Sequence, residues 1–275
     1  MPQPSSLYER RGHLPFGECG EYYQERAGDR NAQVARDCRR KSMRPKLAAI
    51  FALVTAPALA ADAPAPGGYI AVGGSGNLTI QRDGAVSLST LGANGHTCSL
   101  DGGLKGWTIQ SGSGGDPNDL CVIGVKRIAP DGLRLTPADG DACRAYCGAR
   151  ATMDGDFYLP PKGCADAERD ATRKAFKALY DSKRYAEALA KLAPLPKRCE
   201  AQIGWLEMDW ILNDLALTHY RAGDPASCLA DLKPMAKDIA STDDDLRDVY
   251  PPSDFESVYP AIKAARANAK LCKGG

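Results

Sequence analysis

Cysteine and histidine side chains that could bind a metal or carry out catalysis lie close together in one short part of the chain. His96 precedes Cys98 by two residues, and Cys143 is followed by Cys147. Thiolate and imidazole groups bind zinc or act as nucleophiles, whereas paired cysteines form disulfides. Zinc sites usually combine two closely spaced Cys/His pairs, and the chain has only three histidines. Whether these residues bind a metal, act in catalysis or form disulfides depends on whether the protein lies in a reducing or an oxidising compartment.

A complete secretory signal lies inside the chain, over residues 43–60. Arg44 and Lys46 form its positive region, an apolar run covers residues 47–55, and Ala58-Leu59-Ala60 is a typical cleavage site. The apolar run is too short to cross a bilayer. We therefore expect an exported protein, periplasmic or secreted, with no stable membrane anchor after cleavage.

Residues 1–42 precede this signal and show no sustained helical or strand period. Since a secretory signal acts at an N-terminus, we interpret these residues as a disordered extension from a start codon assigned too early. A cytoplasmic tail on an uncleaved anchor is the alternative. The mature chain would then begin near Ala61.

The balance of charged residues in this mature chain limits the classes of partner that it is expected to bind. Without residues 1–60 the chain keeps 25 basic and 28 acidic residues, a balance that argues against nucleic acid and anionic membranes as partners.

An even number of cysteines in an exported chain indicates a disulfide set rather than a metal site. We expect two bonds within the first four cysteines and two within the last four, and no metal or cofactor. The eight cysteines are Cys98, Cys121, Cys143, Cys147, Cys164, Cys199, Cys228 and Cys272.

The pattern over residues 61–163 is typical of a Cys-rich antiparallel β-domain. Turn signals recur every eight to twelve residues, among them Asp83-Gly84, Asp101-Gly102-Gly103 and Asp131-Gly132. Short runs that alternate apolar and polar residues separate them, which predicts a small sandwich or barrel. The runs are 69–72, 77–82, 85–90, 107–110, 120–128, 133–136 and 156–159.

Over residues 164–275 the apolar period becomes helical. Apolar residues at 175, 176 and 179 and again at 185, 188, 189 and 192 predict two helices, and a last helix is expected over residues 254–272. Gly223-Asp224-Pro225 marks the end of one helix and the start of the next. The fold class is therefore α+β: a small antiparallel β sandwich or barrel followed by an all-α helical domain, each held by its own disulfides.

Residues 169–239 resemble tetratricopeptide repeats. Tyr185, Ala188 and Leu192 match aromatic, small and large positions of the family's second helix, and Leu215-Ala216 with Gly223 match a first helix and its turn. Tyr185 and its equivalent Pro225 are 40 residues apart, whereas the family's unit is about 34. The resemblance implies helical hairpins with a concave, peptide-binding face. Its groove positions would be Arg173, Lys177, Tyr180, Trp210, Asn213 and Tyr220.

A second candidate binding surface surrounds two of the cysteines. If residues 143–150 form a strand, Arg144, Tyr146 and Arg150 share the face opposite the cysteines. Two guanidiniums and a phenol there would bind a carboxylate or a phosphate. Exposed arginines that pair with nearby aspartates such as Asp139 or Asp154 are the alternative.

No sequence motif identifies a catalytic residue, because G-x-S-x-G, H-E-x-x-H and P-loop patterns are absent. We therefore predict a non-enzymatic binding protein of the bacterial cell envelope that recognises a protein or peptide. The β-domain resembles periplasmic lysozyme inhibitors at fold level, which makes an inhibitor or immunity protein one version of this function. It departs from their Ser-Gly-x-x-Tyr loop, since no tyrosine follows Ser111-Gly112. A cell-wall hydrolase using Asp and Glu of the β-domain is the alternative.

Overall fold

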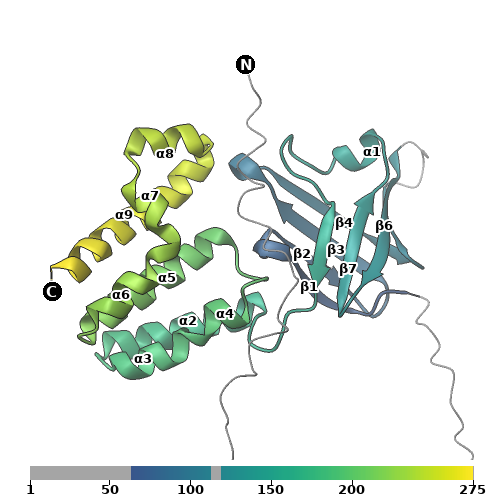
Figure 1. The fold of residues 1–275 in the computed structure, drawn as a ribbon. Helices are drawn as coiled ribbons and strands as arrows, with labels where there is room; N and C mark the ends of the chain where they lie inside the picture. The colour runs from purple at the N-terminus through teal and green to yellow at the C-terminus, as the bar shows by residue number, and fades with distance from the viewer. Residues whose placement is uncertain (1–62, 113–118, 275) are drawn as a thin grey trace, which may run out of the picture. The chain divides into compact units, whose positions relative to one another are not determined.

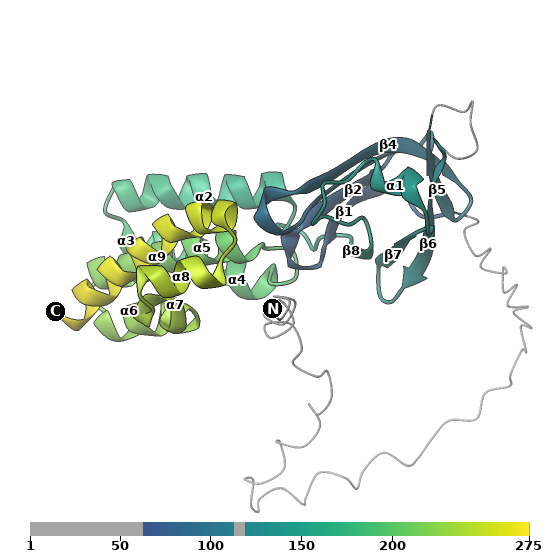
Figure 2. The same ribbon diagram turned by 90° about the horizontal axis from the view of Figure 1, so that it is seen from above.

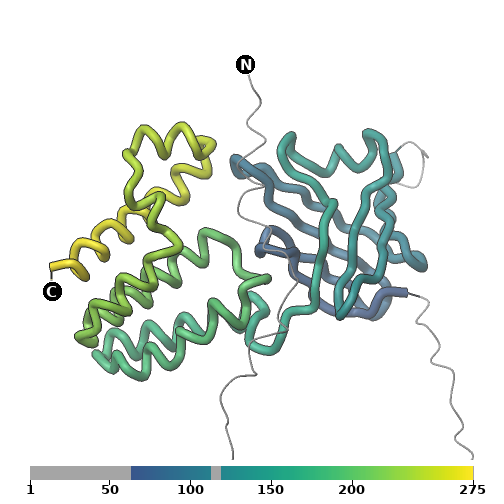
Figure 3. The backbone as a smooth tube through the Cα atoms, viewed as in Figure 1, coloured from purple at the N-terminus to yellow at the C-terminus, as the bar shows by residue number. Residues whose placement is uncertain are grey.

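The β-domain is a closed antiparallel barrel. The structure, a computed structural model, describes residues 63–112 and 119–274, so the predicted extension and signal lie outside the described residues. Each strand pairs with the next along the chain, and the last pairs with the first through Ile70 and Tyr158. Figure 3 traces this meander. The strands are β1 Gly67–Ala71, β2 Gly76–Ile80, β3 Ala85–Leu91, β4 Thr97–Lys105, β5 Thr108–Ser111, β6 Cys121–Ile128, β7 Gly132–Pro137 and β8 Gly155–Tyr158.

Strict alternation decides which side chains fill the barrel. On β2 and β3, Leu78 pairs with Leu88 and Ile80 with Val86, and all four are buried. The residues between them are polar and exposed. Because side chains of a strand alternate between its two faces, one face of each strand enters the core and the other meets solvent. The antiparallel β-domain predicted from the sequence is confirmed, and of the two predicted forms it is the barrel.

One predicted turn is wrong. Asp101-Gly102-Gly103 lies inside β4, where these residues pair with Ser87, Val86 and Ala85 of β3. Gly102 is needed for close packing rather than for a turn, because a Cβ atom there would lie 2.5 Å from the carbonyl oxygen of Gln110. Glycine in a strand often marks such a close backbone approach.

The eight cysteines among the described residues form four disulfides, and the predicted division into two groups is confirmed. Cys98–Cys147 and Cys121–Cys143 join segments of the barrel domain. Cys164–Cys199 and Cys228–Cys272 join segments of the helical part. Among the described residues, no group of three or more His, Cys, Asp or Glu side chains is placed to hold a metal ion.

Eight α-helices follow the barrel in the described part of the chain (Figure 1). α2 packs against α3, α5 packs against α6, and α9 contacts both α5 and α6. None of the helices in residues 63–112 and 119–274 has the length and apolar character to cross a membrane. The helices are α2 Asp166–Asp181, α3 Tyr185–Leu192, α4 Pro194–Arg198, α5 Trp205–Arg221, α6 Pro225–Asp231, α7 Ala236–Ala240, α8 Asp243–Val249 and α9 Pro252–Lys273.

The predicted boundary between α5 and α6 is present in detail. Gly223 has a φ of +83°, a backbone conformation that favours glycine. The carboxylate of Asp224 accepts a hydrogen bond from the backbone N–H of Ser227, and Pro225 is the first residue of α6. This helix start follows the usual N-cap chemistry.

Candidate functional site

The first helices of the two helical pairs, α2 and α5, are joined by two ion pairs. Arg169 of α2 contacts Glu207 of α5 at 2.8 Å, and further along both helices Arg173 contacts Asp214 at 3.5 Å. Both pairs advance in the same direction along each helix, so α2 and α5 run roughly parallel here. Figure 2 shows the two helices from above.

These two ion pairs differ in burial. The Arg169 side chain is 8% exposed, whereas the side chains of Arg173 and Asp214 are 34% and 35% exposed. Arg169 also donates to the carbonyl oxygen of Cys164 at 2.7 Å. The Arg169 pair therefore holds the helices together, while the Arg173 pair lies partly at the surface.

Arg173 has spare hydrogen-bonding capacity. Its 3.5 Å contact with Asp214 is long compared with the roughly 2.7–2.9 Å of a strong charge-assisted hydrogen bond. Its Nε–H group is buried and has no acceptor among the described residues. The buried Nε–H is not accessible to a ligand, so a carboxylate reaching this side chain would meet the partly exposed end of the guanidinium, whose N–H donors pair only weakly with Asp214.

Burial raises the pKa of the Asp214 carboxyl above its usual value, and the positive charges of Arg173 and Lys177 oppose that rise. Lys177 itself is exposed and pairs with Asp181 of the same helix at 2.7 Å. Arg173, Lys177 and Asp214 thus form one polar cluster across α2 and α5, which we call the α2/α5 cluster.

The other predicted groove residues lie in different surroundings. Tyr180 packs on the core of the helical part and contacts the rings of Phe176 and Tyr185. Trp210 is half-buried. Tyr220 packs partly against a second core cluster.

Asn213 is buried, with 3% of its surface exposed. Its amide donates to the carbonyl oxygens of Asp209 and Ala261, and its side-chain oxygen accepts a hydrogen bond from Asn268. Its hydrogen-bonding groups are therefore engaged between α5 and α9.

Sequence reasoning did not single out Asp214 or Glu207. Together with Trp210, they follow the i, i+3, i+4 spacing of one helical stripe along α5, and all three are only half-buried. Asn213 precedes Asp214 by one residue and so lies about 100° away around the helix. A search for the less apolar stripe of α5 would have identified Asp214.

The segment around Cys143 and Cys147 does not form the strand that was predicted. Residues Asp141–Arg144 form the short helix α1. Arg144 donates to the carbonyl oxygens of Ala149 and Ala151 at 3.4–3.5 Å, while Tyr146 hydrogen-bonds to Ser111 at 3.1 Å.

Arg150, the third predicted residue of this surface, is exposed. No ion pair joins Arg144 or Arg150 to Asp139, Asp141 or Asp154, all of which are described residues. The alternative of Arg–Asp pairing is therefore wrong for these residues, and helix α1 replaces the predicted strand alternation.

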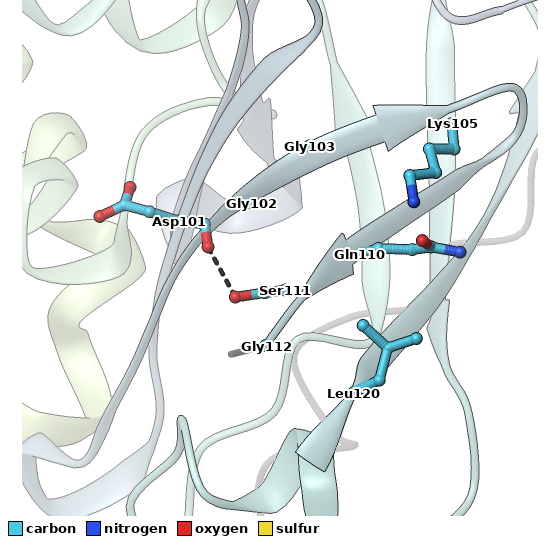
Figure 4. A pocket seen from close by; sticks show the side chains of 8 residues that line it. All are labelled: Asp101, Gly102, Gly103, Lys105, Gln110, Ser111, Gly112 and Leu120. Atoms are coloured by element: carbon cyan, nitrogen blue, oxygen red, sulfur yellow. Dashed lines mark hydrogen bonds between the residues drawn. The ribbon is translucent and has the colours of Figure 1, made fainter. Parts of the chain in front are cut away.

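Two hollows lie on the barrel domain. The larger, about 400 Å³, is lined by residues of β4 and β5 together with Gly112 and Leu120 (Figure 4). The figure shows the Asp101 carboxylate pointing away from Lys105 and Gln110. The smaller, about 240 Å³, includes Asp131. Among the residues that the structure describes, each of these two hollows is lined by one acidic residue, whereas paired-carboxylate hydrolysis requires two.

The fold and its site define a class of protein: an eight-stranded antiparallel barrel followed by a helical domain, with four disulfides. No family model, curated protein or solved structure matches the chain.

Proposed function

We propose that the protein is an exported, non-enzymatic binding protein of the bacterial cell envelope that recognises a protein or peptide through the α2/α5 cluster. The observation that carries the proposal is Arg173, whose guanidinium is partly exposed and only weakly paired with Asp214. A carboxylate of the partner would take the position opposite this guanidinium.

The neighbouring side chains support a peptide rather than a small ion as ligand. Lys177 adds a second positive charge one helical turn from Arg173. Trp210 is half-buried on the same stripe as Asp214, and partly exposed tryptophan is frequent among residues that dominate binding interfaces. These side chains suit a ligand that carries a carboxylate next to an apolar group. A peptide C-terminus, or an acidic side chain beside an apolar one, has this arrangement. The resemblance to tetratricopeptide repeats assigns the same face to peptides.

Export is supported by the disulfides. Four bonds in one chain are typical of an oxidising compartment and rare in the cytosol. With the secretory signal over residues 43–60, they favour a periplasmic or secreted location. An inhibitor or immunity protein is one version of the proposed function, in which the recognised partner is an enzyme.

A peptide-binding experiment tests the proposal. The mature chain is used to select ligands from a library of random dodecapeptides, and dissociation constants of selected peptides are measured by calorimetry. Because charge-assisted pairs within a desolvated site contribute strongly, Arg173→Ala and Lys177→Ala should each weaken binding at least tenfold. Removing the carboxylates of the selected peptides should have a similar effect.

Lys174→Ala is the matched control, because Lys174 is exposed on α2 between the two tested residues and makes no ion pair with any described residue. It should bind within twofold of the wild type. Selected peptides that bind all three variants equally would show that the α2/α5 cluster is not the recognition site. Hydrolysis of the peptides during the measurement would favour the enzyme alternative.

The raised pKa of Asp214 predicts a pH dependence of binding. As pH falls, Asp214 becomes protonated before a carboxylate of ordinary pKa does. In that window Arg173 loses its internal partner while the ligand keeps its charge, so affinity for a carboxylate peptide should rise. At lower pH the ligand is protonated and affinity should fall. Asp214→Asn should abolish the rise without abolishing binding, and an unchanged rise in that variant would contradict this origin.

A further inference from the structure

A partly exposed aromatic pair lies at the start of α5, away from the α2/α5 cluster along the helix. Trp205, the first residue of α5, is 40% exposed and stacks on Tyr250, with ring centroids 6.0 Å apart and ring planes 23° from parallel. Val249, next to Tyr250, is 42% exposed. We call Trp205, Val249 and Tyr250 the aromatic step.

Tyr250 is fixed within the aromatic step by a hydrogen bond and by core packing. Tyr250 donates a hydrogen bond to Asp238 at 3.0 Å. It also packs, with Leu206 and Phe255, against the buried core formed by Leu246 and its neighbours. An apolar surface whose side chains are already ordered loses little entropy when it binds, and rigid, partly exposed tryptophan and tyrosine are enriched at binding hot spots. The step therefore has the properties of an interaction surface.

The segment around the step is strongly acidic. Residues 242–256 contain six acidic side chains and one basic side chain, Arg247. Asp243 and Asp245 are engaged internally, with Arg266 and with the N-cap residue Thr242. Asp244 and Asp248, one helical turn apart on α8, are exposed; Asp244 pairs with Arg247 at 3.1 Å, and 96% of its side chain remains accessible. Asp248 is thus left facing solvent beside Val249, and the carboxylate of Asp244 stays accessible beside its pair with Arg247.

We propose that the aromatic step is a second docking surface, which binds a basic protein segment carrying an apolar side chain. The apolar side chain would pack on the free face of Trp205, and flanking lysines or arginines would face Asp244 and Asp248. The acidic surroundings argue against the other occupants, because a second copy of this chain would bring the same negative charge and nucleic acid would be repelled. This inference does not depend on the α2/α5 cluster.

Three synthetic nonapeptides separate the two components of the surface. The first has three leucines between two runs of three lysines, the second replaces the leucines by serines, and the third replaces the lysines by glutamates. The first should bind the mature chain at least tenfold more tightly than either of the others. Its affinity should fall as salt is raised from 50 to 500 mM, since the exposed charges are then screened.

Variants locate the binding. Trp205→Ala, and separately the double change Asp244→Asn with Asp248→Asn, should each weaken binding of the leucine–lysine peptide at least fivefold. Matched controls are Leu271→Ala, which removes another apolar side chain that is 41% exposed, and Asp170→Asn, which removes an exposed carboxylate of α2. Far-UV circular dichroism checks that every variant is folded. The proposal is overturned if the peptide does not bind below 1 mM, or if either tested change alters affinity by less than twofold.

Discussion

A variant in which Cys98 and Cys147 are both alanine should lose about 4 kcal/mol of unfolding free energy. The bond closes a loop with a sequence separation of 49 residues, and loops of this length restrict the unfolded chain by roughly that amount. It also fastens β4 to the segment that follows α1, because the two cysteines form a β-bridge. We therefore expect the midpoint of urea unfolding to fall sharply.

Reduction provides the control for this prediction. In excess dithiothreitol the unfolding free energy of the wild type should fall as well. If the other three bonds are reduced in both proteins, the wild type and the double variant should then have nearly the same unfolding free energy. A double variant as stable as the oxidised wild type would contradict a structural role for this disulfide. The same comparison bears on export, because a chain that needs its disulfides to fold will not accumulate in a reducing cytosol.

Replacing Arg169 by alanine should destabilise the helical domain by about 3 kcal/mol. The guanidinium is 8% exposed, contacts both carboxylate oxygens of Glu207, and donates to the carbonyl oxygen of Cys164. Removing one partner of a buried pair leaves the other charge poorly solvated, which is the costly part of the change. Because Arg169 joins α2 to α5 one turn before Arg173, the same variant should also weaken peptide binding at the α2/α5 cluster.

Arg134→Ala is the matched control for Arg169→Ala. Arg134 makes an equally well-formed two-pronged contact with Asp156, with both donor–acceptor distances 2.6 Å, but its side chain is 55% exposed. Exposed ion pairs contribute little to stability. The midpoint of thermal unfolding of Arg134→Ala should therefore stay close to that of the wild type. Equal losses in the two variants would show that burial is not what distinguishes these pairs.

Local patterns along the chain were enough to predict many of the strands and helices of this protein, although not β4 or α1. Alternation in segments such as Leu78–Ile80 predicts strands with one buried face, because neighbouring side chains of a strand point to opposite sides. The helical period after Ala165 and the turn at Gly223-Asp224-Pro225 predict helices in the same way. The even number of cysteines in the predicted mature chain, and their distribution along it, predicted the two groups of disulfides.

Only the tertiary structure decided how these elements meet. Whether β8 returns to β1 to close a barrel is a matter of twist and register, which no local pattern records. Gly102 was mistaken for a turn residue because the backbone that passes close to it, at Gln110, is found only once β4 and β5 are paired. Arg173 and Asp214 are 41 positions apart, and Asn213 lies inside the helical domain while Asp214 reaches the surface. Such contacts depend on which face of a helix packs against its neighbour, and a one-residue difference rotates a side chain by about 100°.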